Sequence, residues 1–155
     1  MKKYLLIIVC SLLFVSMRAQ AQDRGFGVGF VTGQPTGIST KIWTGPTNAL
    51  QFALAWRNDD PFFGNRVSIS GDYLWHSFDA IRSTYRFPVY YGVGGTFTSG
   101  RPQSDILGVR GVVGIAYWPR KAPIDIFLQV VPTLVLTPST SINVNVGLGG
   151  RYFFN

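Results

Sequence analysis

Alternation of large apolar residues with small or polar ones is the feature that most limits the fold of this sequence. In residues 48–56, Phe52 and Trp56 share one face with the leucines, while Gln51 shares the other with the alanines. This period of two is that of a β-strand, whose successive side chains point to opposite faces. Seven further segments show it, at 25–32, 36–43, 65–76, 86–97, 107–117, 124–131 and 142–154. The sequence therefore predicts eight strands joined by turn-rich segments.

Composition agrees with an all-β chain of one domain. Of the 155 residues, 18 are Gly, 15% are aromatic, and all seven acidic residues are Asp. Glu favours helices, whereas aromatic residues suit strands and Gly suits turns. A hydrophobic content of 46% also excludes a disordered chain.

The first 21 residues carry the parts of a secretory signal peptide. Lys2 and Lys3 precede an apolar run at 4–15, and residues 19–21 (AQA) supply a small–x–small cleavage site. The run is shorter than the roughly 20 apolar residues of a transmembrane helix. We expect cleavage after Ala21, which leaves a β-barrel domain at 22–155.

Cleavage would also change the charge and the chemistry of the chain. Loss of Lys2, Lys3 and Arg18 lowers the formal charge from +7 to +4, and the remaining cations are scattered, so we expect no nucleic-acid partner. Cys10 leaves with the signal peptide. The mature chain would therefore form no disulfide and have no thiol chemistry.

The two faces of the predicted strands indicate which solvent surrounds them. One face is large and apolar, and the other is small or polar. The lumen of an eight-stranded barrel is only wide enough for side chains to fill, so the large face would overcrowd it. Eleven residues tilted by about 40° rise about 28 Å, close to the apolar band of outer-membrane barrels. The sequence predicts an eight-stranded antiparallel up-and-down transmembrane β-barrel in the outer membrane.

Aromatic residues recur where alternate strands end. With the N-terminus in the periplasm, the even-numbered strands end on the periplasmic side, and Trp56 lies at the outer rim. Amphipathic rings settle at headgroup depth, whereas the alternative is an ordinary aromatic core. The predicted girdle consists of Trp43, Trp56, Trp75, Tyr117, Trp118, Tyr152 and Phe154.

Charged residues on the small face are expected inside the barrel. Because buried charges need partners, we expect Arg110 and Arg151 to contact Asp72 or Asp125. The predicted polar network consists of Lys41, Arg66, Asp72, Arg110, Asp125, Gln129 and Arg151, beside Gln51, Asn143 and Asn145. A filled lumen predicts a plug, and the alternative is a selective ion path.

Two constellations suggest chemistry, but their spacing argues against it. The glycines of residues 25–29 have period two and precede no helix, unlike a dinucleotide-binding loop. Asp72 and His76 share a face but lie roughly 13 Å apart along the strand, and Ser77 lies beyond its end. We expect no catalytic residue, no metal site and no cofactor.

Several stretches also resemble those of a known family. They are residues 33–37 (GQPTG), 72–76 (DYLWH), 123–128 (PIDIFL), 136–140 (LTPST) and 149–154 (GGRYFF). They are similar to stretches of small bacterial outer-membrane β-barrel proteins without assigned activity. The resemblance covers nearly all of 22–155 and implies an eight-stranded barrel of the OmpA/OmpX type without catalytic residues. Such barrels usually end on an aromatic residue, whereas here Asn155 follows Phe154.

These features predict a small integral outer-membrane protein with a structural or surface-interaction role. The alternatives are a lipid-modifying outer-membrane enzyme that uses His76 and Ser77, and a periplasmic lipocalin-like carrier. The expected partners are outer-membrane lipid and lipopolysaccharide, the barrel-assembly machinery during insertion, and an extracellular protein of unknown identity.

The outward loops expected at 33–35, 57–64, 98–105 and 137–141 are short for such a barrel. The richest of them combines paired acids with aromatic residues, which often dominate interface energetics. The candidate surface contact consists of Asp59, Asp60, Phe62 and Phe63. Alternatively, the two phenylalanines belong to the outer girdle.

Overall fold

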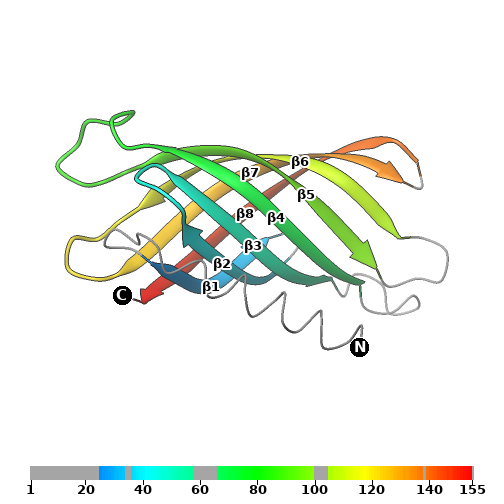
Figure 1. The fold of residues 1–155 in the computed structure, drawn as a ribbon, viewed down its shortest axis with the longest axis horizontal. Coiled ribbons are helices and arrows are strands. Elements are labelled where there is room, and N and C mark those ends of the chain that lie inside the picture. Colours follow the sequence, from blue (N-terminus) through cyan, green and yellow to red (C-terminus); the bar gives the residue numbers. More distant parts are fainter. Residues whose placement is uncertain (1–24, 34–35, 58–65, 100–104, 138, 155) are drawn as a thin grey trace, which may run out of the picture.

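The chain folds into a closed antiparallel β-barrel in which each strand pairs with its sequence neighbours (Figure 1). A computed structural model describes residues 25–33, 36–57, 66–99, 105–137 and 139–154. The strands are β1 (Phe26–Gly33), β2 (Thr36–Trp43), β3 (Asn48–Arg57), β4 (Arg66–Ser77), β5 (Val89–Ser99), β6 (Ile106–Tyr117), β7 (Ile124–Thr137) and β8 (Ser141–Phe154).

Pairing of the first strand with the last closes the sheet. The ladder between β1 and β8 runs from Phe26↔Phe154 to Gly33↔Gly147. Closure leaves no strand edge unpaired. The predicted all-β barrel of eight antiparallel strands is confirmed. Within the described residues, no helix is long and apolar enough to cross a bilayer.

The connections define two ends of the barrel. Residues 44–47, 78–88 and 118–123 join successive strands at one end, which we call the turn end. β1 begins and β8 finishes at this same end (Figure 1). The opposite end, where β3 finishes and β4 begins, is the loop end.

Most strand boundaries lie within two residues of the sequence prediction, and the two larger differences both involve proline. β5 begins at Val89 rather than at residue 86, because Pro88 interrupts the segment and Arg86 forms only an isolated bridge to Trp118. β7 continues past Pro132 to Thr137. Proline donates no ladder hydrogen bond. Pro132 pairs with Val144 of β8 and falls in a gap of the β6–β7 ladder, so its missing N–H costs little.

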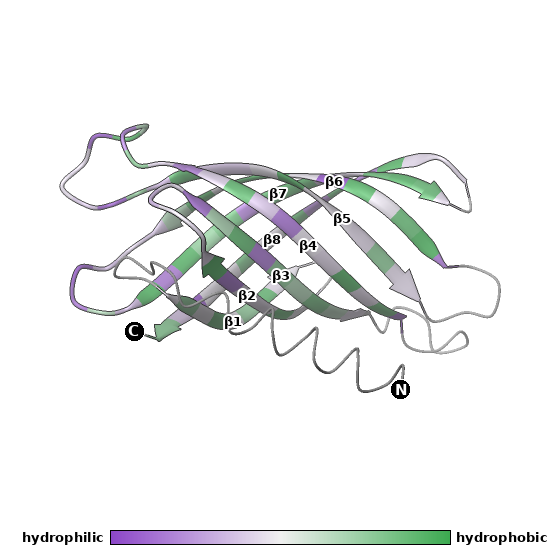
Figure 2. Cartoon of the chain, viewed as in Figure 1, coloured by the Kyte–Doolittle hydropathy of each residue, from purple (hydrophilic) through white to green (hydrophobic). Residues whose placement is uncertain are grey.

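Burial alternates along the strands as the sequence pattern predicts. In β7 the exposed and buried classes alternate from Ile124 to Leu136. Outward side chains are large and apolar, and several are strongly exposed, such as Phe30 (68%) and Ile142 (74%). Bands of hydrophobic and hydrophilic residues follow one another along the ribbon (Figure 2).

The inward face is not as small as the sequence pattern indicated. A buried cluster inside the barrel consists of Val31, Leu74, Tyr90, Val112, Ala116, Trp118, Phe127 and Val131. The large rings fit because glycines lie opposite them on the neighbouring strand. Tyr90 pairs with Gly114, and its ring occupies the space of a Cβ there. Phe127 has the same relation to Gly149.

This packing predicts that Gly114→Ala destabilises the barrel by about 1–3 kcal/mol, since the new methyl overlaps the Tyr90 ring. Gly95→Ala is the matched control, because a Cβ there meets only a carbonyl oxygen at 3.7 Å. Urea unfolding of the refolded barrel measures both variants. Equal urea midpoints for the two variants would contradict the claim that the Tyr90 ring needs a glycine at position 114.

Candidate functional site

A bidentate ion pair joins β4 to β6 across the intervening strand. Arg110 Nε donates to Asp72 Oδ1 at 2.8 Å, and Nη2 donates to Oδ2 at 2.8 Å. Gly94 of β5 pairs with Asp72 on one side and with Arg110 on the other. A Cβ at Gly94 would overlap the carboxylate. The glycine therefore leaves the path open for a charge-assisted pair of the strong kind.

A second arginine, on the opposite side of the barrel, also bonds to an aspartate and reaches across a neighbouring strand past a glycine. Arg151 pairs with Asp125 of β7, and its Nη1 donates to Oδ2 at 3.2 Å. Its Nε donates to Ser39 Oγ at 3.1 Å, past Gly29 of β1, which pairs with both residues. Lys41 Nζ lies 3.6 Å from Asp125 Oδ2. One carboxylate thus holds two cations.

Amide side chains connect the two ion pairs. Arg151 Nη2 donates to Gln51 Oε1. Gln51 Nε2 in turn lies 3.3 Å from Asp72 Oδ2 and 3.4 Å from Gln129 Oε1. Tyr90 donates to Gln129 at 3.2 Å. We call this connected set the lumen network: Lys41, Gln51, Asp72, Tyr90, Arg110, Asp125, Gln129 and Arg151.

The lumen network is buried, and its charges nearly balance. The side chains of Lys41, Asp125 and Arg151 have no exposed surface. Three cations face two carboxylates, and aromatic rings contribute further stabilisation. The Arg151 guanidinium lies 3.8 Å from the Phe127 ring centroid, and Lys41 Nζ lies 5.0 Å from the Trp43 centroid. Charges buried this deeply persist only when they are paired.

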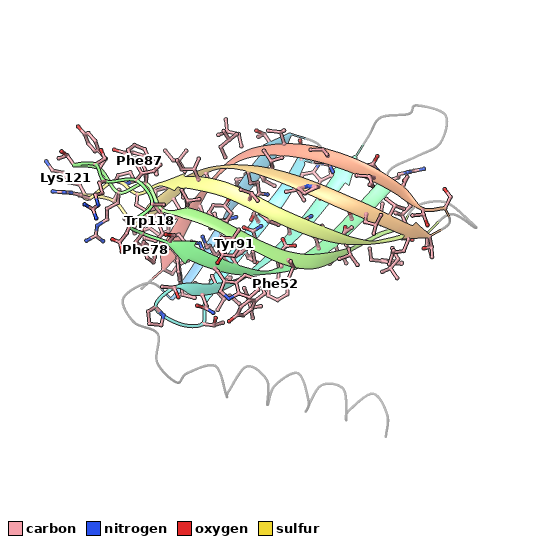
Figure 3. The ribbon with its side chains drawn as sticks, turned by 90° about the horizontal axis from the view of Figure 1, so that it is seen from above. Phe52, Phe78, Phe87, Tyr91, Trp118 and Lys121 are labelled. Carbon is pink, nitrogen blue, oxygen red and sulfur yellow. The ribbon has the colours of Figure 1, made fainter. Side chains whose placement is uncertain are left out.

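Aromatic side chains pack together at the turn end of the barrel, where Figure 3 labels Trp118 and Phe78. The ring centroids of Trp43 and His76 lie 4.4 Å apart, and those of Trp43 and Trp118 lie 5.7 Å apart. Phe78 packs 5.3 Å from Trp118. Both tryptophans were expected in the outward girdle, and that assignment is wrong. Trp43 shares the inward parity of Lys41, and Trp118 lies just beyond the last residue of β6.

A polar cavity lies on the other side of the lumen network, toward the loop end. Its volume is about 130 Å³. Arg66, Asn143 and Asn145 line this cavity together with Arg110, so the structure does not bring Arg66 into the lumen network. A hydrogen bond of 2.7 Å between Ser68 and Thr98 crosses its wall. This part of the lumen is thus lined by polar side chains and has room for water molecules.

The residues considered for catalysis are not brought together. The Asp72 carboxylate is engaged by Arg110 and Gln51, while His76 Nδ1 lies 3.2 Å from the Thr47 carbonyl oxygen. Ser77 is exposed, whereas His76 is buried inside the barrel. Among the described residues, no group of three or more His, Cys, Asp or Glu could hold a metal ion.

Outward aromatic residues gather toward the turn end. Of the predicted girdle, Trp75, Tyr117, Tyr152 and Phe154 lie on the outward side there, and Trp56 lies outward near the loop end. The sequence analysis missed four neighbours, namely Tyr73, Tyr85, Phe87 and Tyr91. Tyr73 and Tyr91 contact Trp75 with centroids 4.9 and 5.9 Å away. The outward parity of Tyr73 in β4 and Tyr91 in β5 could have identified these two, whereas Tyr85 and Phe87 lie in the connection between the strands.

The candidate surface contact at Asp59, Asp60, Phe62 and Phe63 lies outside the described residues, as does the predicted signal peptide at 1–21. Comparisons with family models, with curated proteins and with solved structures gave no match. Of the features that the family resemblance implies, the structure shows the closed eight-stranded barrel.

The ion pair between Arg110 and Asp72 predicts that removal of one partner costs more stability than removal of both. Arg110→Met should destabilise the barrel by about 3–5 kcal/mol, because it leaves the Asp72 carboxylate buried without its cation. The double variant Arg110→Met/Asp72→Asn should recover most of that loss. Urea unfolding of the refolded protein measures the free energies.

Arg66→Met is the matched control, since Arg66 forms no ion pair with a described residue and should change stability little. A double variant as unstable as Arg110→Met alone would contradict the assignment of the loss to the stranded carboxylate.

Proposed function

We propose that this protein is a small integral outer-membrane β-barrel of the OmpA/OmpX type, with a structural or surface-interaction role and a plugged lumen. The observation that carries the proposal is the exposure of large apolar side chains on outward faces around the barrel. Soluble monomers rarely expose a contiguous apolar patch larger than a few hundred Å². The hydrocarbon core of a bilayer would cover such a surface all around the barrel.

The length of the apolar surface supports the same proposal. On β8, exposed apolar residues run from Ile142 to Phe154. At about 3.3 Å per residue and a tilt of about 40°, this span rises roughly 30 Å. The apolar band of outer-membrane barrels is about 25 Å tall. Outward aromatic residues near the turn end, such as Trp75 and Tyr152, suit its interface with water.

The filled interior favours a plugged barrel, rather than a channel or a carrier. The lumen network spans the barrel, and the aromatic side chains around Trp43 and Trp118 fill its turn end. The cavities on its other side measure only about 130 and 40 Å³, and polar side chains such as Arg110 and Asn145 line both together with apolar ones. Carrier sites for small molecules are mostly apolar and of roughly 300–1,000 Å³.

An enzymatic role is less favoured, because catalysis needs a nucleophile and a base within hydrogen-bond reach. Buried His76 and exposed Ser77 do not meet that condition. The partners that suit the proposed role are membrane lipid, lipopolysaccharide and the barrel-assembly machinery. An extracellular partner would bind at the loop end, where β3 finishes and β4 begins.

The proposal predicts that the mature protein fractionates with the outer membrane and that a charge on its outward face impairs folding. Val93 lies midway along β5 and is 57% exposed. Arginine at the bilayer midplane costs about 2–4 kcal/mol. We therefore expect Val93→Arg to lower the amount of folded barrel, measured as the band that migrates differently on gels with and without boiling.

Ile124→Arg is the matched control, because Ile124 begins β7 at the turn end, where the cost falls to about 0–1 kcal/mol. In a soluble barrel, both exposed positions would tolerate arginine equally. Release of the wild-type protein by osmotic shock, or normal folding of Val93→Arg, would overturn the membrane proposal.

A further inference from the structure

Positive charge gathers at the turn end, outside the lumen. Connections 78–88 and 118–123 carry four basic residues, Arg82, Arg86, Arg120 and Lys121, which we call the basic rim. All four are exposed, and Asp79 is the one acid in these two connections. Every other basic residue whose burial is described faces the lumen or its cavity. The excess of three positive charges is therefore a local property of this end.

Backbone and side-chain contacts join the two connections into one surface. Trp118 N donates to the Arg86 carbonyl oxygen at 3.1 Å, and Arg120 Nη2 donates to the Thr84 carbonyl oxygen at 2.7 Å. Phe87 of the first connection and Lys121 of the second both lie at this end of the barrel (Figure 3). Arg86 and Arg120 thus hold the rim together, while Arg82 and Lys121 form no ion pair with a described residue.

An aromatic cluster lies beside the basic rim. The rings of Tyr85, Phe87 and Tyr117 contact one another, with centroids 5.3–6.5 Å apart. Tyr85 is 57% exposed, and Tyr117 lies on the outward face of β6. Aromatic rings prefer headgroup depth, and cations just beyond them reach the phosphate layer. The cluster and the rim together have the layering of a membrane interface.

We propose that the basic rim binds the phosphate groups of anionic phospholipid headgroups in the leaflet at the turn end. This inference rests on the proposed membrane location. Basic residues next to a membrane attract anionic lipid, and the attraction weakens with salt. Connection 78–88 is also long for an end whose turns are normally short in such barrels. This connection carries Arg82 and brings Arg86 beside Arg120 and Lys121, with which Arg86 lines one surface hollow.

The test uses the full mature chain folded in zwitterionic micelles and follows its backbone amide NMR shifts. The probes are dihexanoyl phosphatidylglycerol, dihexanoyl phosphatidylcholine, inorganic phosphate and a polyaspartate peptide. Phosphatidylglycerol should shift residues of 78–88 and 118–123 more strongly than the other probes, and added salt should weaken its binding.

Arg82→Gln/Lys121→Gln should weaken phosphatidylglycerol binding by roughly tenfold or more, because each basic residue near the surface adds to the attraction. This variant keeps the contacts of Arg86 and Arg120, so the rim should stay folded. Arg66→Gln is the matched control, since it removes one positive charge at the loop end, and it should leave binding unchanged.

Equal binding of the two lipids, or unchanged binding in the double variant, would overturn the proposal. Phosphate binding as strong as that of phosphatidylglycerol would indicate a small-anion site instead, and a response to polyaspartate alone would indicate a protein partner. Failure of the membrane proposal has a different signature, namely a chain that folds without detergent. A barrel that folds in micelles without preferring phosphatidylglycerol contradicts only the role of the rim.

Discussion

Two arginine–aspartate pairs inside the barrel determine how the rest of the structure is arranged. Arg110 reaches Asp72 past Gly94, and Arg151 reaches Ser39 past Gly29 while it holds Asp125. Buried charges are tolerated only with close partners, so these pairs require a fixed register across several strands. A slip of one residue in a strand would turn its charges outward and its apolar residues inward.

The interior therefore differs along the barrel axis. Aromatic rings around Trp43 close the turn end, the lumen network crosses the middle, and a polar cavity lies toward the loop end. Paired and packed side chains of this kind stabilise the barrel and leave little space in its lumen. The features that remain available for recognition lie on the outside: the apolar outward faces and the basic rim.

The sequence predicted the fold and the parity of the strands, because a period of two records which side chains share a face. It could place Lys41, Asp72, Arg110 and Arg151 inside, but it could not show which residues of neighbouring strands pair with one another. That information decides the fit of the Tyr90 ring over Gly114. The inward tryptophans were misassigned for a different reason. The prediction relied on their place at a strand end, although the parity of Lys41 and Ala116 puts Trp43 and Trp118 on the inward side.

The four tryptophans of the chain test the central claim, an apolar exterior around a polar and aromatic interior. Trp56 and Trp75 lie on the outward side, whereas Trp43 and Trp118 pack inside. Four single-tryptophan variants, with phenylalanine at the other three positions, can be refolded in bilayers that contain lipid brominated along its acyl chains. The account predicts that bromine quenches the fluorescence of Trp56 and Trp75 much more than that of Trp43 and Trp118. Equal quenching of all four, or none at all, would contradict it.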